Sequence, residues 1–178
     1  MHHQDRLYAV CLRMVGREAA ADLTQDAMVK ILQGLEGYDG RSQLSTWMIR
    51  IAMNACLSWL RGQKLRRHKG LGGYEEDSVR GLGTEGTGGE LSAGMGVQRN
   101  ERQIAVSASL TELPDDQRAI LILRDVQGLD YEQVGAVLEI AVGTVKSRLF
   151  RARLALRELV EERLGTSGRV GEGGNEQS

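Results

Sequence analysis

Aromatic side chains are scarce in this chain of 178 residues: Phe, Trp and Tyr together make up 4% of it, whereas glycine contributes 23 residues. The hydrophobic fraction, 41%, is that of an ordinary globular protein. A chain with so few aromatics and so many glycines does not suit a large sheet protein. The composition favours small helical units joined by flexible chain.

Cysteine is almost missing as well. The two that occur, Cys11 and Cys56, form no CxxC pair and have no histidine nearby. This argues against a disulfide framework and against a zinc site. We expect both thiols to be small buried hydrophobic groups, with a redox switch as the alternative. The sequence indicates no metal site and no cofactor.

Long apolar runs are also lacking. No stretch of about 18 apolar residues occurs, and the first residues, MHHQDRLYAV, lack the apolar core of a signal peptide. We therefore expect no membrane insertion and a cytoplasmic location.

Glycine and acidic residues gather in residues 70–98, where ten of 29 residues are Gly and acids outnumber bases five to one. Burial cannot offset the ordering entropy of such a segment, so we expect a flexible Gly-rich linker. Residues 165–178 have a similar composition and are expected to form a disordered tail. What remains is one lobe over residues 1–69 and a second over residues 99–164, each near the smallest size at which a helical bundle folds alone.

Apolar periodicity predicts two main helices in the N-terminal lobe. The first runs from about Ala19 to Leu35, with apolar residues at every fourth position: Leu23, Ala27, Ile31 and Leu35. The second begins at a capping Ser45. Its apolar stripe consists of Met48, Ile51, Ala52, Ala55 and Trp59. Its opposite face carries polar side chains: Arg50, Asn54, Ser58 and Arg61.

The C-terminal lobe carries sharper start and stop signals. A helix over Glu101–Leu113 ends before Pro114, and the next helix has two acids in its first turn and stops at Gly128. Asp130 and Gln133 then match a capping box and begin a short helix to about Leu138. A brief turn leads into another helix near Gly143, so the pattern is that of a helix-turn-helix.

The last of these helices is strongly basic. Its sequence, GTVKSRLFRARLALREL, has no Asp or Glu before Glu158, and the acid-free stretch runs from Ala141 to Arg157. The net charge of the whole chain, by contrast, is only -1. Its apolar stripe, expected to pack on the lobe, is Val145, Leu149, Ala152 and Leu156. The side chains off that stripe are Thr144, Lys146, Ser147, Arg148, Arg151 and Arg153.

A helix of this kind fits the major groove of DNA, where residues near its N-terminus reach base edges and flanking cations meet phosphates. The alternative is a solvated surface face, but solvated helices normally intersperse acids at i±4. We therefore expect duplex DNA contact from this helix.

Two blocks of the chain resemble the extracytoplasmic-function (ECF) sigma factors, a compact class of RNA polymerase initiation subunits in the sigma-70 family. In the first block, DLTQDAMVKIL resembles the helix that binds core polymerase, and YDGRSQLSTWMIRIAMNACLSWLR resembles the segment that reads the minus-ten element. The second, LPDDQRAILILRDVQGLDYEQVGAVLEIAVGTVKSRLFRARLALREL, resembles the domain that reads the minus-thirty-five element. The resemblance implies an all-α fold with a region 2-like bundle and a region 4-like helix-turn-helix domain.

The resemblance assigns roles to residues of the N-terminal lobe. The face formed by Asp22, Gln25 and Asp26 would dock on the clamp helices of the largest polymerase subunit, with a plain solvated face as the alternative. The flap of the polymerase would contact the C-terminal domain. The side chains that would hold an unpaired minus-ten strand are Tyr38, Trp47, Arg50, Asn54 and Arg61. Trp47 borders the apolar stripe, so a core tryptophan remains the alternative there.

The function implied is that of a non-enzymatic subunit that directs core RNA polymerase to specific promoters and promotes DNA melting. An anti-sigma partner is a further possibility that the family suggests. The alternative from another class is a helix-turn-helix repressor or activator that acts without core polymerase. No carboxylate cluster, metal-ligand spacing or phosphate-binding loop supports an enzyme.

Overall fold

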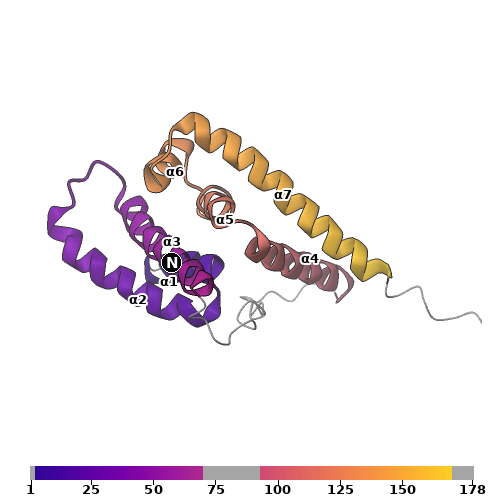
Figure 1. Cartoon of the computed structure of the whole chain (residues 1–178). Helices are drawn as coiled ribbons and strands as arrows, with labels where there is room; N and C mark the ends of the chain where they lie inside the picture. The colour runs from indigo at the N-terminus through magenta and orange to yellow at the C-terminus, as the bar shows by residue number, and fades with distance from the viewer. Residues whose placement is uncertain (1–2, 70–92, 170–178) are drawn as a thin grey trace, which may run out of the picture.

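The computed structural model describes residues 3–69 and 93–169, and in these residues all regular secondary structure is helical (Figure 1). This confirms the all-α fold class. Most of the expected linker over residues 70–98, and the end of the expected tail, residues 170–178, lie outside the described residues.

Three helices build the N-terminal lobe: α1 (His3–Val15), α2 (Arg17–Gly34) and α3 (Leu44–His68), with a short 3-10 helix, η1 (Leu35–Gly37), after α2. All three long helices contact one another. Gly16 separates α1 from α2 and has a φ of 82°, a left-handed conformation that side chains disfavour, so the chain turns a tight corner there. The fully buried side chains of the bundle include Leu7, Val10, Met14, Ile49 and Met53.

The expected stripe of α2 is confirmed at Leu23, Ala27 and Ile31, which are buried. Leu35 was wrongly included, since 47% of it is exposed. The α-helix ends at Gly34, and the tighter η1 turn that follows rotates Leu35 away from the bundle core.

The N-cap of α3 lies two residues earlier than predicted, so Ser45 does not cap the helix. Its N-cap residue is Gln43, which makes no side-chain capping bond. Met48, Ala52 and Ala55 are buried as expected, while Ile51 and Trp59 are half-buried. A second buried row of α3 was not predicted: Ile49, Met53 and Cys56.

Cys11 of α1 and Cys56 of α3 are both buried and free. The hydrogen bond to Cys11 and burial among apolar side chains raise the pKa of the Cys56 thiol. The expectation of buried thiols is thus confirmed.

The C-terminal lobe consists of α4 (Ala93–Glu112), α5 (Asp115–Leu121), a π-helical turn η2 (Ile122–Val126), α6 (Tyr131–Leu138) and α7 (Val142–Arg169). Two of its boundaries differ from the sequence expectation. The α4 helix begins inside the segment expected to be linker, and α7 continues past residue 164 into the expected tail. Composition predicted the loss of order there, but a helix already nucleated by packing extends through residues of poor propensity.

The short α6 helix is built as predicted. The Asp130 carboxylate accepts a hydrogen bond from the Gln133 backbone N–H at 2.7 Å, and the Gln133 side chain accepts one from the Asp130 N–H at 2.9 Å. Gly128, just before this capping box, has a φ of 71°, which fits its role as the stop of the preceding helix.

The turn between α6 and α7 is unusually close-packed. A Cβ atom at Gly135 would lie 2.8 Å from the Ile140 carbonyl oxygen, so only glycine fits at this point of α6. Glu139 ends α6 in the left-handed conformation, with φ 57° and ψ 42°. Together these two residues set the angle at which α7 leaves the turn.

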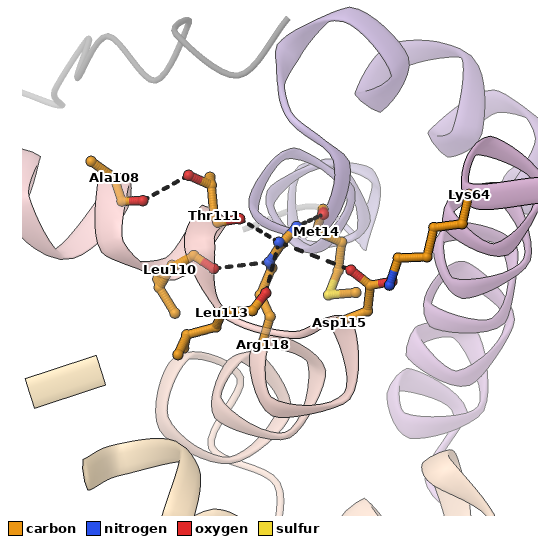
Figure 2. Close-up of polar contacts among 8 residues, drawn as sticks. All are labelled: Met14, Lys64, Ala108, Leu110, Thr111, Leu113, Asp115 and Arg118. Carbon is orange, nitrogen blue, oxygen red and sulfur yellow. Dashed lines mark hydrogen bonds and ion pairs between the residues drawn. The ribbon is translucent and has the colours of Figure 1, made fainter. Parts of the chain in front are cut away.

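Arg118 joins the two lobes. Its guanidinium donates to the Met14 carbonyl at the end of α1 at 2.6 Å and to three carbonyls around the α4–α5 corner, those of Leu110, Thr111 and Leu113, at 2.6–3.0 Å (Figure 2). Burial lowers the pKa of Arg118, and the nearby Asp115 carboxylate opposes that shift. The charge is therefore held by carbonyl dipoles and one carboxylate in place of water.

We expect Arg118→Met to lower the free energy of unfolding by at least about 3 kcal/mol, because several buried carbonyls lose their donor at roughly 1–3 kcal/mol each. The matched control is Arg124→Met, since Arg124 donates to a single carbonyl, that of Leu129, at 2.7 Å. Urea unfolding followed by circular dichroism measures both variants. Equal losses in the two would contradict the special role of Arg118.

Candidate nucleic-acid interface

The basic helix is α7, and its N-terminal half has the two faces that the sequence predicted. Val145, Leu149 and Ala152 are buried against the lobe, and Leu156 is half-buried. The α7 helix contacts α4, α5 and α6, and in Figure 1 it is the long helix along one side of the molecule. Most side chains on its opposite face are exposed over residues 143–158.

The six side chains proposed for duplex contact fall into different environments. Lys146, Ser147, Arg151 and Arg153 are exposed, and Thr144 and Arg148 are half-buried. Arg153 is engaged with Asp125 of η2 through two hydrogen bonds, at 3.0 and 2.5 Å. The hydrogen bonds to Asp125 raise the pKa of Arg153 and direct its guanidinium toward η2, away from the open face of α7.

Two other cations near α7 stack on an aromatic ring. Lys146 and Arg124 lie over the ring of Tyr131, with 5.6 and 4.9 Å from the cationic atoms to the ring centroid. Arg151, by contrast, makes only a long contact of 3.4 Å to the Ser147 carbonyl one turn back. Arg148 lies 4.0 Å from the Asp116 carboxylate. Of the three arginines predicted on α7, Arg151 is the one without an acidic partner in the described residues.

Sequence reasoning missed two apolar side chains on the open face of α7. Phe150, the one phenylalanine of the chain, is 72% exposed, and Leu154 one turn later is 49% exposed. An exposed apolar side chain on a groove-entering helix can contact the methyl group of thymine. The signal was present in the sequence, since both residues lie off the apolar stripe and between basic residues.

The residues proposed for an unpaired strand begin with an aromatic pair at the start of α3 and continue along that helix. The rings of Tyr38 and Trp47 have centroids 5.3 Å apart and planes tilted by 45°. Trp47 also packs on Gly34, where a Cβ atom would lie 3.2 Å from the indole ring. Trp47 is half-buried, so it both closes the bundle and presents an edge to solvent.

Polar groups line α3 from this aromatic pair toward the basic end of the helix. Arg50, Asn54, Ser58 and Arg61 are all exposed, as predicted for the face opposite the core. Arg61 donates to the Ser58 hydroxyl at 2.9 Å. The Asn54 side chain makes no hydrogen bond within the described part of the chain, so its amide can offer both a donor and an acceptor to a base edge.

A third surface lies on α2. Asp22, Gln25 and Asp26 are exposed as predicted. The same helical face continues into two exposed apolar residues that were not predicted, Val29 and Leu32, the latter 67% exposed. A polar patch followed by an exposed apolar patch on one face is typical of a protein interaction site.

The described residues contain neither a metal-binding cluster nor a membrane-spanning helix. No group of three or more His, Cys, Asp or Glu side chains is placed to hold a metal ion there. Within the same residues, no helix is both long and apolar enough to cross a membrane.

Comparison with known proteins accounts for both lobes. The sequence profile of Sigma-70 region 2 matches residues 1–66, and that of Sigma-70, region 4 matches residues 103–156. The chain is 32% identical over 165 residues to the ECF RNA polymerase sigma-E factor of Escherichia coli (strain K12), with 90% of this chain and 84% of that protein covered. The chain belongs to the ECF sigma factors.

Other relatives agree with this membership. The RNA polymerase sigma-H factor of Pseudomonas aeruginosa is 31% identical over 162 residues, with 90% of this chain and 83% of that protein covered. Among solved structures, the sigma factor RpoE of Bartonella quintana, in complex with the anti-sigma factor NepR, superposes with a TM-score of 0.70 at 26% identity and covers 89% of this chain and 92% of that chain. CnrH, in complex with the cytosolic domain of CnrY, shares the fold with a TM-score of 0.59 at 21% identity, over 90% of this chain and 83% of that chain.

As an ECF sigma factor, the chain is a non-enzymatic subunit of RNA polymerase that directs promoter-specific transcription initiation. The region 2 match identifies the N-terminal lobe as a sigma-factor domain. A helix-turn-helix repressor that acts without polymerase does not require such a domain. The α7 helix lies in the region 4 match, and the α2 and α3 surfaces lie in the region 2 match.

The environments of the two arginines on α7 lead to a prediction. We expect Arg151→Ala to weaken binding to a duplex selected from a random pool by roughly 1–3 kcal/mol, because a solvent-directed guanidinium is free to reach the groove. Arg153→Ala is the matched control and should cost less, since Asp125 already holds that charge. Fluorescence anisotropy across a salt series measures both. A larger loss for Arg153→Ala would overturn this assignment.

Proposed function

We propose that the two DNA-reading surfaces of this sigma factor divide the promoter between them. The α7 helix reads the minus-thirty-five element as duplex through Thr144, Lys146, Ser147, Arg148 and Arg151, with Arg153 as a lesser phosphate contact. The open basic face of α7, free of acids over residues 141–157, is the observation that supports this assignment most.

We infer that the start of α3 captures an unpaired minus-ten strand. A base that leaves the stack needs a ring on which to stack and a polar group at its edge. Tyr38 and Trp47 supply the rings, and Asn54 supplies the edge contact. Arg50 and Arg61 on the same face neutralise the phosphates of the strand.

The polymerase contact is assigned to α2 on the same reasoning. Asp22, Gln25 and Asp26 give a charged patch that fixes register, and Val29 and Leu32 give apolar area that is removed from water on docking. We propose the clamp helices of the largest subunit as the occupant of this face, with the flap on the C-terminal lobe. A subunit that works with polymerase and chromosomal DNA acts in the cytoplasm.

An anti-sigma factor is a further proposed partner. The support is the similarity to RpoE of Bartonella quintana, whose structure is a complex with the anti-sigma factor NepR.

Run-off transcription with purified core polymerase tests the proposed function as a whole. We expect promoter-dependent transcripts from fragmented genomic template when the chain is added, and none without it. Asp26→Lys should reduce the transcripts by lowering affinity for core polymerase, whereas Glu101→Lys, a charge reversal on α4, should leave them unchanged. Absence of any promoter-dependent transcript from a folded protein would sink the proposal.

The strand-capture assignment has its own prediction. We expect Asn54→Ala to leave duplex binding within about two-fold of the parent but to lower open-complex formation roughly ten-fold, since one good base-edge contact is worth roughly 1–3 kcal/mol. Permanganate reactivity of unpaired thymines in the complex with core polymerase measures opening. Ser58→Ala, on the same exposed face and one turn further along α3, is the control. Normal melting with Asn54→Ala would place the strand elsewhere.

A further inference from the structure

Polar contacts hold the two lobes of this chain together, and one of them uses Arg50, a residue proposed to read the promoter. The Arg50 guanidinium of α3 lies 2.6 Å from the carboxylate of Glu139, the residue that ends α6 in the helix-turn-helix. Lys64, in the basic end of α3, lies 2.6 Å from Asp115 of α5 (Figure 2). Two cations of the α3 face are thus neutralised by acids from the other lobe.

Further contacts hold the same arrangement. Gln133 of α6 donates to the hydroxyl of the buried Thr46 on α3 at 3.3 Å, and Arg6 of α1 donates to the side chain and the backbone carbonyl of Gln127 at 2.8 and 2.9 Å. The Arg118 bond to Met14 completes the set. In Figure 1, α6 accordingly lies over the start of α3.

This closed arrangement cannot read both promoter elements at once. Glu139 precedes Thr144 by five residues, so the N-terminal end of α7 lies within about 25 Å of the Arg50 guanidinium. Elements named minus-ten and minus-thirty-five lie about 25 base pairs apart, which is roughly 85 Å of duplex at 3.4 Å per base pair. The lobes must therefore separate before both surfaces engage one promoter.

Glu139 is an unexpected residue for its backbone position. In the described chain it is the one non-glycine residue with a positive φ, a conformation that favours Gly or Asn at the end of a helix. Its carboxylate, however, reaches Arg50 across the lobes. The backbone conformation therefore does not explain why this position carries a glutamate, whereas the ion pair with Arg50 does.

We propose that the free chain holds itself in a closed, promoter-incompetent state, with the Glu139 carboxylate as a latch on Arg50. This inference rests on the proposed function of Arg50 and adds its regulation. A strand phosphate and the Glu139 carboxylate compete for the same guanidinium. Only open molecules bind the promoter, so the apparent affinity equals the affinity of the open state multiplied by the fraction of molecules that are open. Opening the lobes is then part of promoter engagement.

Distance measurement between the lobes tests the latch without DNA or polymerase. Glu18→Cys on α2 and Glu158→Cys on α7, both exposed positions, carry a donor–acceptor dye pair for energy transfer, while Cys11 and Cys56 stay buried in the fold. A KCl titration from about 0.05 to 1 M weakens the exposed ion pairs and shifts the chain toward the open state. The ratio of closed to open molecules can then be measured even if one state dominates at low salt.

We expect Glu139→Asn to lower the closed-to-open ratio about two- to five-fold, the range of an exposed ion pair. Asn accepts the left-handed conformation, so the turn itself is preserved. Glu101→Gln, which changes the net charge equally on α4, should leave the ratio unchanged. Arg50→Glu should open the chain, and Arg50→Glu combined with Glu139→Arg should close it again. Equal ratios in Glu139→Asn and the parent, or no recovery in the charge swap, would overturn the latch.

Transcription separates this proposal from the one on which it rests. At limiting chain concentration, Glu139→Asn should raise run-off transcription with core polymerase by about the same factor as it opens the lobes. If no version of the chain supports transcription, the proposed function fails, while the distance measurement still decides the latch. If the parent transcribes but is already open at low salt, the latch alone is refuted.

Discussion

The arrangement of the two lobes depends on one buried guanidinium. Arg118 donates to carbonyls at the end of α1, at the end of α4 and in the corner before α5, groups that no backbone hydrogen bond of a regular helix satisfies (Figure 2). Helix ends buried without donors are costly, so this side chain stabilises the corner between α4 and α5 against the N-terminal lobe. The rigid planar fork of arginine suits the task, because one lysine ammonium could not reach all four oxygens.

Charge is distributed so that closure and promoter binding draw on the same cations. The acids that face α3 belong to α5 and to the α6–α7 turn, while α3 and α7 carry the bases. A chain with a net charge of -1 can therefore present strongly basic surfaces to DNA and still neutralise part of them internally. The internal pairs are exposed to solvent at Arg50 and Glu139, so they exchange readily with phosphate.

Local signals in the sequence predicted much of the fold. The capping box at Asp130, the stop at Gly128 and the apolar stripe of α7 were read correctly because each depends on residues within a few positions of one another. The N-terminal limit of α3 was misplaced because Gln43 begins the helix without the side-chain cap that marks most starts. Leu35 was misassigned because periodicity does not show where a helix tightens.

Contacts between distant residues could not be predicted. Arg118 looks like any surface arginine in the sequence, and its burial follows from four carbonyls that meet only in the folded chain. The candidate site was predicted to the extent that it consists of helix faces: the open faces of α2, α3 and α7 carry the expected residues. The environments of these residues were not predicted. Arg153 pairs with Asp125 and Arg50 pairs with Glu139, and the partners in each pair lie far apart in the chain.

The glycine at position 135 has a consequence for how such a protein can diversify. Because Gly135 has no side chain, the α6 helix can pack closely against the Ile140 carbonyl. The direction of α7 is therefore set by residues that do not contact a base. The residues that would touch bases lie beyond the turn, on the mostly exposed face of α7. Substitutions there can retarget the chain to a new sequence while the angle of entry stays constant, so a change of regulon needs no change of scaffold.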